Sequence, residues 1–225
     1  MKVLMTVCGV RWFPLCKYWI DQIDFLDKLL IKGYNFDEAN QIRRNFFLEH
    51  TEYTHLLVYA EDIVTTPDVV KLLIDDAREY DYPVVTAWLN FDFKRDWLAV
   101  SKTPLENVRI AFAEQYHFIK PTDVLYYDSP FEEVTFTGMP LTLIRRDVVE
   151  KVTFRPYTYV TDRVLGVYMR RGTQHDLQFC LECRKLGIPI VMDKRAFAVH
   201  FGDTGRFINL AKVEREVEFV KASRP

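Results

Sequence analysis

The sequence predicts a single α/β domain with a mostly parallel central sheet that is flanked by helices. One observation is the apolar run "KVLMTVCGV" at residues 2–10, which indicates a strand buried on both faces, as in parallel sheets. A second is that such runs alternate with segments whose apolar residues follow a helical period. A third is that the sequence holds no internal repeat, low-complexity segment or linker. Strands that alternate with helices imply right-handed crossovers and parallel pairing.

After the first strand, the periodicity predicts a helix over residues 17–31 and a second helix that begins near Asn35. Asn35 is a suitable N-cap, and Glu38 three residues later is its capping-box partner. The next strand is expected from His55 to Ala60.

Helix-start signals follow this strand. Thr66 and Pro67 fit the N-cap and the first position of a helix that reaches about Tyr80. "DYP" then predicts a turn and "VVTAW" a strand. Residues 90–135 are rich in aromatic side chains, and we expect hairpins mixed with long loops there.

The second half of the chain predicts further strands and helices. "VTFTGMPLTLIRRDVVEKV" reads as two strands interrupted by Gly-Met-Pro, then a short helix from about Asp147. "TQHDLQFCLECRKLG" predicts a helix with Thr173 as its cap and Gly187 as its stop. "IPIVMD" and "AFAVHFG" predict two short strands.

Residues 203–225 predict a charged C-terminal helix. Its narrow apolar stripe consists of Val213, Val217 and Val220. Such a stripe could pair with a second copy of the chain, so a homodimer is one expectation.

The composition is that of a soluble globular protein. The 225 residues are 49% hydrophobic and 28% charged with a formal net charge of −2, which favours neither nucleic acid nor an acidic membrane as partner. We recognise no signal peptide, and no apolar run approaches the roughly 20 residues that span a bilayer. The expectation is a cytoplasmic protein without a transmembrane segment. The lone Cys180–Cys183 spacing favours buried thiols over metal or redox chemistry.

Two adjacent carboxylates, Glu61 and Asp62, come directly after the predicted strand 55–60. Ligands of parallel α/β sheets bind at the carboxyl ends of the strands, where this pair would lie. The pair could hold a cation there, or it could simply close a polar turn before the next helix. Position alone leaves both interpretations open.

Four segments from Asn45 to His200 carry a resemblance to one enzyme family. "RRNFFLEHTEYTHLLVYAEDI" is similar to an Arg-Asn pair on a helix before a strand that ends in an Asp-x-Asp metal motif. "TGMPLTLIRRDVVEKV" is similar to a glycine-containing strand that ends in an Arg pair and a helix. "QHDLQFCLECRKLGIPIVMD" is similar to a Glu-Asp helix that carries a catalytic base, and "AFAVHFG" to a closing strand with a metal-binding His. Together they resemble the GT-A glycosyltransferases, especially the inverting family-2-like enzymes.

The sequence also departs from this family's pattern. Ala60 stands where the metal motif has its first carboxylate, and His175 stands where a Glu precedes the catalytic Asp. Little room is left for the family's second strand, unless "LIKGYNF" contains it.

The resemblance implies a single GT-A (Rossmann-like) domain. Residues 1–89 would form its nucleotide-sugar-binding half, residues 90–202 an aromatic-rich acceptor and catalytic half, and residues 203–225 the helical tail. Its activity would be metal-dependent transfer of a sugar from a nucleotide-sugar, such as a UDP- or GDP-sugar, to a hydroxyl of a glycan, lipid or protein, with inversion. The alternative is a catalytically inactive GT-A-like protein that binds nucleotide or glycan. A sugar nucleotidyltransferase is disfavoured because "CGVRWFP" is not a Gly-rich phosphate loop.

The resemblance also implies a divalent metal site. Mn²⁺ or Mg²⁺ would stabilise the diphosphate leaving group, with Asp62 as the main ligand, Glu61 beside it and His200 as a further ligand. Its position alone, at the end of an apolar strand, would instead indicate that His200 has a structural role and binds no metal.

Asp176 matches the family's catalytic base, which takes a proton from the acceptor hydroxyl. Thr173 and Asp176 also have capping-box spacing, so the carboxylate could simply cap its own helix.

The remaining site residues follow from the resemblance and from residue chemistry. His175 and Trp88 are candidates for binding the acceptor. Candidates for binding the donor are Arg44, Asn45, Gly138, Arg170 and Arg171, the last two on a loop before the catalytic helix. A solvated charge run, a strand bulge and core packing are the ordinary alternatives for these residues.

Overall fold

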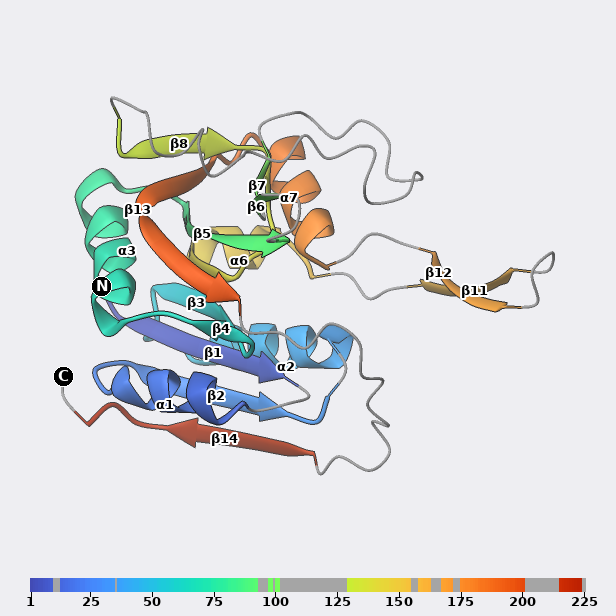
Figure 1. Cartoon of the computed structure of the whole chain (residues 1–225), viewed down its shortest axis with the longest axis horizontal. Coiled ribbons are helices and arrows are strands. Elements are labelled where there is room, and N and C mark those ends of the chain that lie inside the picture. Colours follow the sequence, from blue (N-terminus) through green and yellow to red (C-terminus); the bar gives the residue numbers. More distant parts are fainter. Residues whose placement is uncertain are drawn as a thin grey trace.

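The computed structural model is a mixed α/β fold with helices on both faces of one central sheet (Figure 1). The residues it describes are 1–9, 13–34, 36–92, 97–98, 100–101, 129–154, 158–162, 167–171, 175–200 and 215–223.

Within these ranges the central sheet has ten strands, eight of them in the order β14-β2-β1-β3-β10-β5-β13-β4. Five run parallel: β1 (Val3–Gly9), β2 (Asp27–Lys32), β3 (His55–Ala60), β5 (Val84–Asp92) and β13 (Ile190–His200). The others pair antiparallel to a neighbour: β4 (Ile63–Val64), β6 (Trp97–Leu98), β8 (Phe131–Val134), β10 (Leu141–Arg145) and β14 (Glu216–Val220). The α/β prediction is confirmed at this level, but the sheet is mixed rather than mostly parallel.

Two small two-stranded sheets complete the described strands. One joins β7 (Val100–Ser101) to β9 (Phe136–Thr137), and the other joins β11 (Thr158–Asp162) to β12 (Val167–Arg171).

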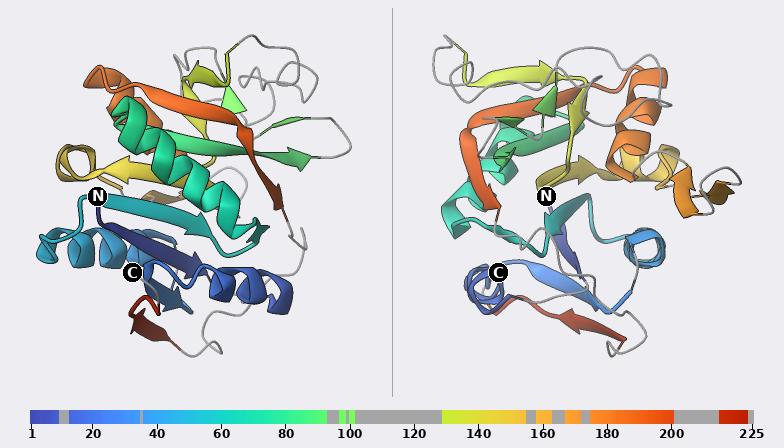
Figure 2. Two further views of the ribbon diagram at one scale, coloured as in Figure 1. Left: turned by 90° about the vertical axis from the view of Figure 1, so that its left-hand side faces the viewer. Right: turned by 45° about the vertical axis from the view of Figure 1, so that its right-hand side comes forward.

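The helices divide between the two faces of the sheet (Figure 2). One apolar cluster packs α2 (Phe36–Glu49), α6 (Arg146–Lys151) and α7 (His175–Lys185) against one face. The other cluster packs α1 (Pro14–Gln22) and α3 (Pro67–Tyr80) against the opposite face. Alternate residues of β1 enter the two clusters, with Leu4 and Cys8 on one side and Met5 and Val7 on the other. The prediction of a first strand buried on both faces is therefore confirmed.

The helix predicted over residues 17–31 is wrong in its second half. The helix α1 ends at Gln22, and residues 27–32 form β2 between β1 and β14. Leu29 and Leu30 point into different clusters, as strand alternation requires, because both faces of the sheet are covered. A second strand therefore follows β1 and α1, and its last three residues, 30–32, are the first three of "LIKGYNF".

The predicted C-terminal helix is wrong in its described part, since residues 216–220 form the edge strand β14, antiparallel to β2. "EVEFV" alternates charged with apolar residues, which is a strand pattern. Phe219 packs on Phe46 of α2 and on His50, the residue after α2, with ring centroids 5.3 and 6.4 Å away. Val217 is exposed, so the valine stripe that suggested a homodimer does not form as a helical face over these residues.

The two strands predicted from "IPIVMD" and "AFAVHFG" are one long strand, β13, with an irregularity between Met192 and Phe197. Strand β3 and helix α3 have the predicted bounds. Most of the aromatic segment 90–135 and the caps Asn35 and Thr173 lie outside the described residues. Across the part of the chain that the structure describes, no helix is both long and apolar enough to cross a membrane.

Candidate functional site

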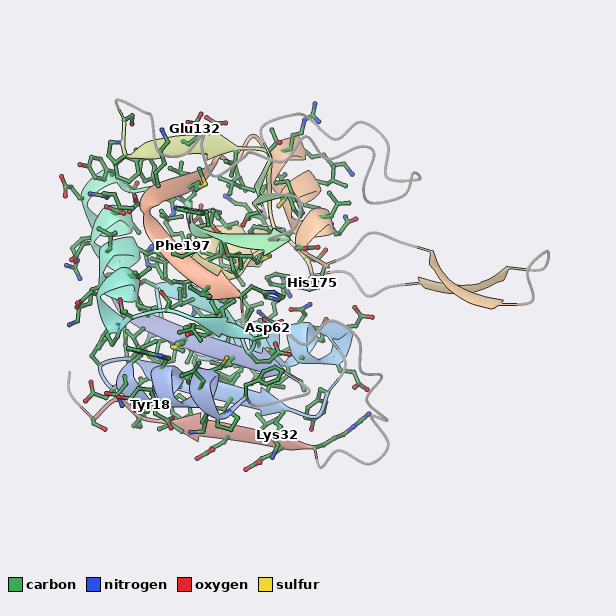
Figure 3. All side chains as sticks on the ribbon, in the orientation of Figure 1. Tyr18, Lys32, Asp62, Glu132, His175 and Phe197 are labelled. Carbon is green, nitrogen blue, oxygen red and sulfur yellow. The ribbon has the colours of Figure 1, made fainter. Side chains whose placement is uncertain are left out.

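The candidate site lies at the edge of the sheet where the five parallel strands end (Figure 3). Strand β3 ends at Ala60, and Glu61 and Asp62 form the two-residue turn that joins it to β4. Strand β13 ends at His200, the last described residue of its segment. This edge is where α/β sheets bind their ligands.

The pairing of β4 with the end of β13 brings the turn to His200. Val64 pairs with Val199 and Ile63 with His200, and Thr65 Oγ1 donates to the Phe197 carbonyl at 3.4 Å. Asp62 and His200, 138 residues apart in sequence, consequently lie in contact, with 3.0 Å between Asp62 Oδ2 and His200 Nε2.

The contact between Asp62 and His200 has an electrostatic consequence. The hydrogen bond to the carboxylate raises the pKa of His200 above its usual 6.5, against the opposing effect of burial. The side chains keep 33% and 25% of their surface exposed, so a ligand from solvent can reach both.

Asp62 and His200 suit a divalent cation as two of its ligands. Carboxylate oxygen and imidazole nitrogen are common metal ligands, and two adjacent ligands at about 2.1 Å from an octahedral ion lie roughly 3 Å apart, which is the observed spacing. Among the described residues, however, no group of three or more His, Cys, Asp or Glu side chains is arranged to hold a metal. A cation here would take its other ligands from water or from a bound substrate.

Glu61 lies over the end of β1, against Gly9. A Cβ atom on Gly9 would collide with the Glu61 side chain, so this close approach requires glycine. The Glu61 carboxylate also acts on the buried thiol of Cys8, whose pKa is about 11, chiefly because of burial. The predicted role of Glu61 as a metal ligand stays a prediction.

Asp176 is the second residue of α7 and is almost fully buried. Its Oδ1 accepts the Leu177 backbone N–H at 2.8 Å. Burial raises the pKa of the Asp176 carboxyl to about 6, although this hydrogen bond opposes the rise. A carboxyl group that titrates near neutral pH is suited to accept and release a proton. Figure 3 shows His175, its neighbour, at the same end of the sheet as Asp62.

Arg44 and Asn45, the predicted donor-binding pair, point elsewhere. Arg44 donates from Nε to the Val149 carbonyl and from Nη2 to the Glu150 carbonyl, both at 3.2 Å, which ties α2 to α6. Asn45 is exposed and accepts a hydrogen bond from Gln41.

Two neighbours on α2, Asn40 and Arg43, were not singled out from the sequence. They are 1% and 3% exposed. Within the described ranges, both polar atoms of the Asn40 amide and Nε and Nη1 of Arg43 have no hydrogen-bond partner. The positive charge of Arg43 acts on the Cys8 thiol, near the end of β1. The spacing along the helix is the sequence signal that could have identified Arg43 as a buried residue. Ala39, Arg43 and Phe47 are spaced by four and share the buried face of α2.

The remaining predicted residues are dispersed. Trp88 is half-buried and donates from Nε1 to the Lys194 carbonyl at 2.9 Å. Its ring contacts that of Phe197 in a tilted arrangement, with the ring centroids 4.4 Å apart. Gly138 is half-buried between β9 and β10. Arg170 and Arg171 lie in strand β12 rather than on a loop, and Figure 1 shows the β11–β12 hairpin extending away from the central sheet.

The contact between Asp62 and His200 predicts a pH-dependent stability. Because the folded-state pKa of His200 is raised, its stabilisation is complete below the usual imidazole pKa and is lost as the pH rises through the raised value. We expect Asp62→Asn to cost on the order of 1 kcal/mol of unfolding free energy near pH 6, and much less near pH 9, since screening limits a partly exposed pair. Urea unfolding at both pH values measures this.

A double-mutant cycle with His200→Gln provides the control for this measurement. The coupling energy between the two substitutions should vanish at the higher pH. An equal loss at both pH values would contradict the charged contact.

Comparisons with known proteins support the fold and no more. No family model and no curated protein matches the sequence. Among solved structures, the crystal structure of A197 from STIV is similar, with a TM-score of 0.55 and 17% identity, over 90% of this chain and 87% of that one. At this identity the likeness establishes a shared mixed α/β fold.

Proposed function

We propose that the chain is a GT-A-type glycosyltransferase that transfers a sugar from a UDP- or GDP-sugar to an acceptor hydroxyl with inversion. The observation that carries the proposal is the contact of Asp62 with His200, at 3.0 Å, on the edge where the parallel strands end. A divalent cation bound there, Mn²⁺ or Mg²⁺, would supply stabilisation of the negative charge on a diphosphate leaving group.

The buried polar side chains of α2 support a donor site at this edge. A buried guanidinium without hydrogen-bond partners is costly, and so is a buried amide. The Asn40 amide and two nitrogens of the Arg43 guanidinium, Nε and Nη1, are in this state within the described ranges, and Arg43 lies next to Cys8 near the end of β1. A bound nucleotide would offer oxygen acceptors to both side chains, so we assign donor binding to Asn40 and Arg43 ahead of Arg44 and Asn45.

Asp176 is the proposed general base. In an inverting transfer, a base takes the proton from the acceptor hydroxyl while the oxygen attacks the anomeric carbon and the diphosphate leaves. A carboxyl with a pKa of about 6 is ionised at neutral pH and still binds a proton readily. His175, which precedes it, is a candidate to contact the acceptor.

One observation favours the alternative of a catalytically inactive relative that binds nucleotide or glycan. Within the described ranges, no group of three or more His, Cys, Asp or Glu side chains is arranged to hold a metal, and Glu61 lies over Gly9. Such a protein would bind a nucleotide with a cation and would hydrolyse no donor.

Donor hydrolysis separates the two functions. We expect wild-type protein with Mn²⁺ to hydrolyse at least one of a panel of UDP-, GDP- and dTDP-sugars, EDTA to abolish this, and Asp62→Asn to lower it by roughly 100-fold or more. Asp68→Asn removes a carboxylate that is 90% exposed on α3 and is the matched control. Nucleotide binding without hydrolysis, with or without candidate acceptors, would support the inactive relative. If the protein neither binds nor hydrolyses any of these nucleotides, both proposed functions are contradicted.

Asp176→Asn tests the general base. We expect turnover with an acceptor to fall by about 10²- to 10⁴-fold, with donor binding retained. Wild-type kcat/KM should rise with pH through about 6, where the carboxyl ionises.

The stability of the same variant provides the control. Because burial raises the Asp176 pKa, the wild type loses stability as the pH rises through about 6, and Asn removes this loss. The variant should therefore be at least as stable as the wild type above that pH. If Asp176 only caps its helix, the variant would lose on the order of 1 kcal/mol of stability and keep its turnover.

A further inference from the structure

A cavity of about 730 Å³ lies at the opposite edge of the sheet from Asp62, where β1 and β2 begin. Figure 1 shows the start of the chain and the end of β14 on this side of the molecule. Helix α3 and the segment after β14 also contribute to its walls. Its volume is in the range of roughly 300 to 1,000 Å³ that is usual for small-molecule sites.

The described side chains that line the cavity carry an excess of positive charge. The cations come from three parts of the chain: Lys2 precedes β1, Lys71 and Arg78 lie on α3, and Lys221 follows β14. The described carboxylates in the lining are Asp27 and Asp75. Four cationic side chains therefore face two acidic ones.

The compensation of these charges is incomplete at Asp27. Lys2 Nζ and Lys221 Nζ each lie 3.8 Å from the same oxygen, Asp27 Oδ2. That oxygen also accepts the Tyr53 hydroxyl at 2.6 Å, and Oδ1 accepts the Ala222 N–H at 2.9 Å. These hydrogen bonds and the two ammonium groups lower the pKa of Asp27, against the effect of burial. One carboxylate, each of whose oxygens already accepts a hydrogen bond, is thus the shared partner of two ammonium groups.

The cations on α3 have weak partners. Lys71 lies 3.6 Å from Asp68, whose carboxylate is 90% exposed, and Arg78 pairs with Asp75 on the exposed helix surface. Surface pairs of this kind contribute little and exchange readily with another anion. The guanidinium fork of Arg78 also matches the geometry of a phosphate group.

The lining of the cavity also contains apolar side chains. Val3, Leu26 and Ile74 are 5%, 7% and 8% exposed, and the partly buried Phe25 lies beside them with Lys71 Nζ 5.3 Å from its ring centroid. Because Val3, Leu26 and Ile74 are already buried, the apolar surface that a ligand can cover belongs to Phe25 and to Met1, which is 45% exposed, and covering it would gain hydrophobic free energy.

From this combination we infer that the cavity binds a phosphate monoester with an apolar substituent. The phosphate lies among Lys2, Lys221 and Arg78, and the apolar group packs on Phe25 and Met1. Phosphate monoesters carry between about one and a half and two negative charges at neutral pH, which matches the excess of cations. The site is separate from the proposed transfer site, so its occupancy requires neither the cation nor Asp62.

Calorimetry with hexyl phosphate, in buffer containing EDTA, tests the inference. We expect hexyl phosphate to bind the wild type more tightly than either inorganic phosphate or hexanol, since each of these lacks one half of the ligand. Lys2→Gln combined with Lys221→Gln should weaken binding roughly tenfold or more. Lys151→Gln, which removes an exposed lysine paired with Asp147 on α6, should leave it unchanged.

Further variants keep the outcome interpretable. Lys2 also lies over the Tyr53 ring, so its substitution removes a contact that stabilises the fold. Arg78→Gln is therefore the second variant. It alters an exposed residue that takes no part in the Asp27 hydrogen bonds, and it should also weaken the binding of hexyl phosphate. Asp62→Asn should bind hexyl phosphate as the wild type does, which keeps this test independent of the proposed transferase activity.

Three results would overturn the inference: no binding of hexyl phosphate at millimolar concentration, equal binding of inorganic phosphate, or binding unchanged in both lysine and arginine variants. Sedimentation with phosphatidic acid vesicles then identifies the source of the ligand. Vesicle binding that the lysine substitutions abolish supports the inference with a lipid as ligand, whereas binding of hexyl phosphate alone supports it with a soluble ester.

Discussion

The pairing of β4 with the last residues of β13 is the constraint on which the candidate site depends. It holds Asp62 and His200 in contact although 138 residues separate them. The pairing requires β13 to bend after Met192, where its register with β5 shifts. Arg195 stabilises this bend: its Nε lies 3.0 Å from buried Asp193, and its Nη2 lies 2.7 Å from Asp76 on α3. Because α3 begins directly after β4, both partners of the pairing are anchored to the same helix.

The orientation of α2 determines which of its polar side chains can contact a ligand at the edge of the sheet that holds Asp62 and His200. Arg44 bonds to carbonyl groups of α6 and acts as a clamp between helices, whereas Arg43 turns inward beside Cys8. Since a helix advances by about 100° per residue, adjacent arginines necessarily face different surroundings. Asn40 shares the inward face one turn earlier, and its amide, like Nε and Nη1 of Arg43, has no hydrogen-bond partner inside the described ranges. Such side chains are expected where the protein supplies half of an interaction and a ligand the other half.

The sequence predicted those elements whose signals are local. Strand 55–60 is an unbroken apolar run, and Thr66-Pro67 marks the start of α3, so both have the expected bounds. Strand β2 could not be separated from the helix before it, since its leucines also fit a helical period over 17–31. Val217 and Val220 fitted a helical stripe, but they lie in the edge strand β14, which pairs with β2. The approach of His200 to Asp62 depends on long-range pairing, so only the resemblance to a family suggested it. Which of Arg43 and Arg44 faces the candidate site depends on how α2 is rotated about its axis relative to the sheet, and the sequence alone does not give this rotation.

Mn²⁺ binding, followed by electron paramagnetic resonance in the presence of UDP or GDP, tests the central claim most directly. If the edge of the sheet where the parallel strands end binds a nucleotide diphosphate together with a cation, the wild type will bind Mn²⁺ more tightly with nucleotide than without it. Asp62→Asn and His200→Gln will then each weaken this binding by roughly tenfold or more, and Asp68→Asn will leave it unchanged. Binding that neither substitution at the edge affects would contradict the account, because the contact between Asp62 and His200 would then be only a structural hydrogen bond.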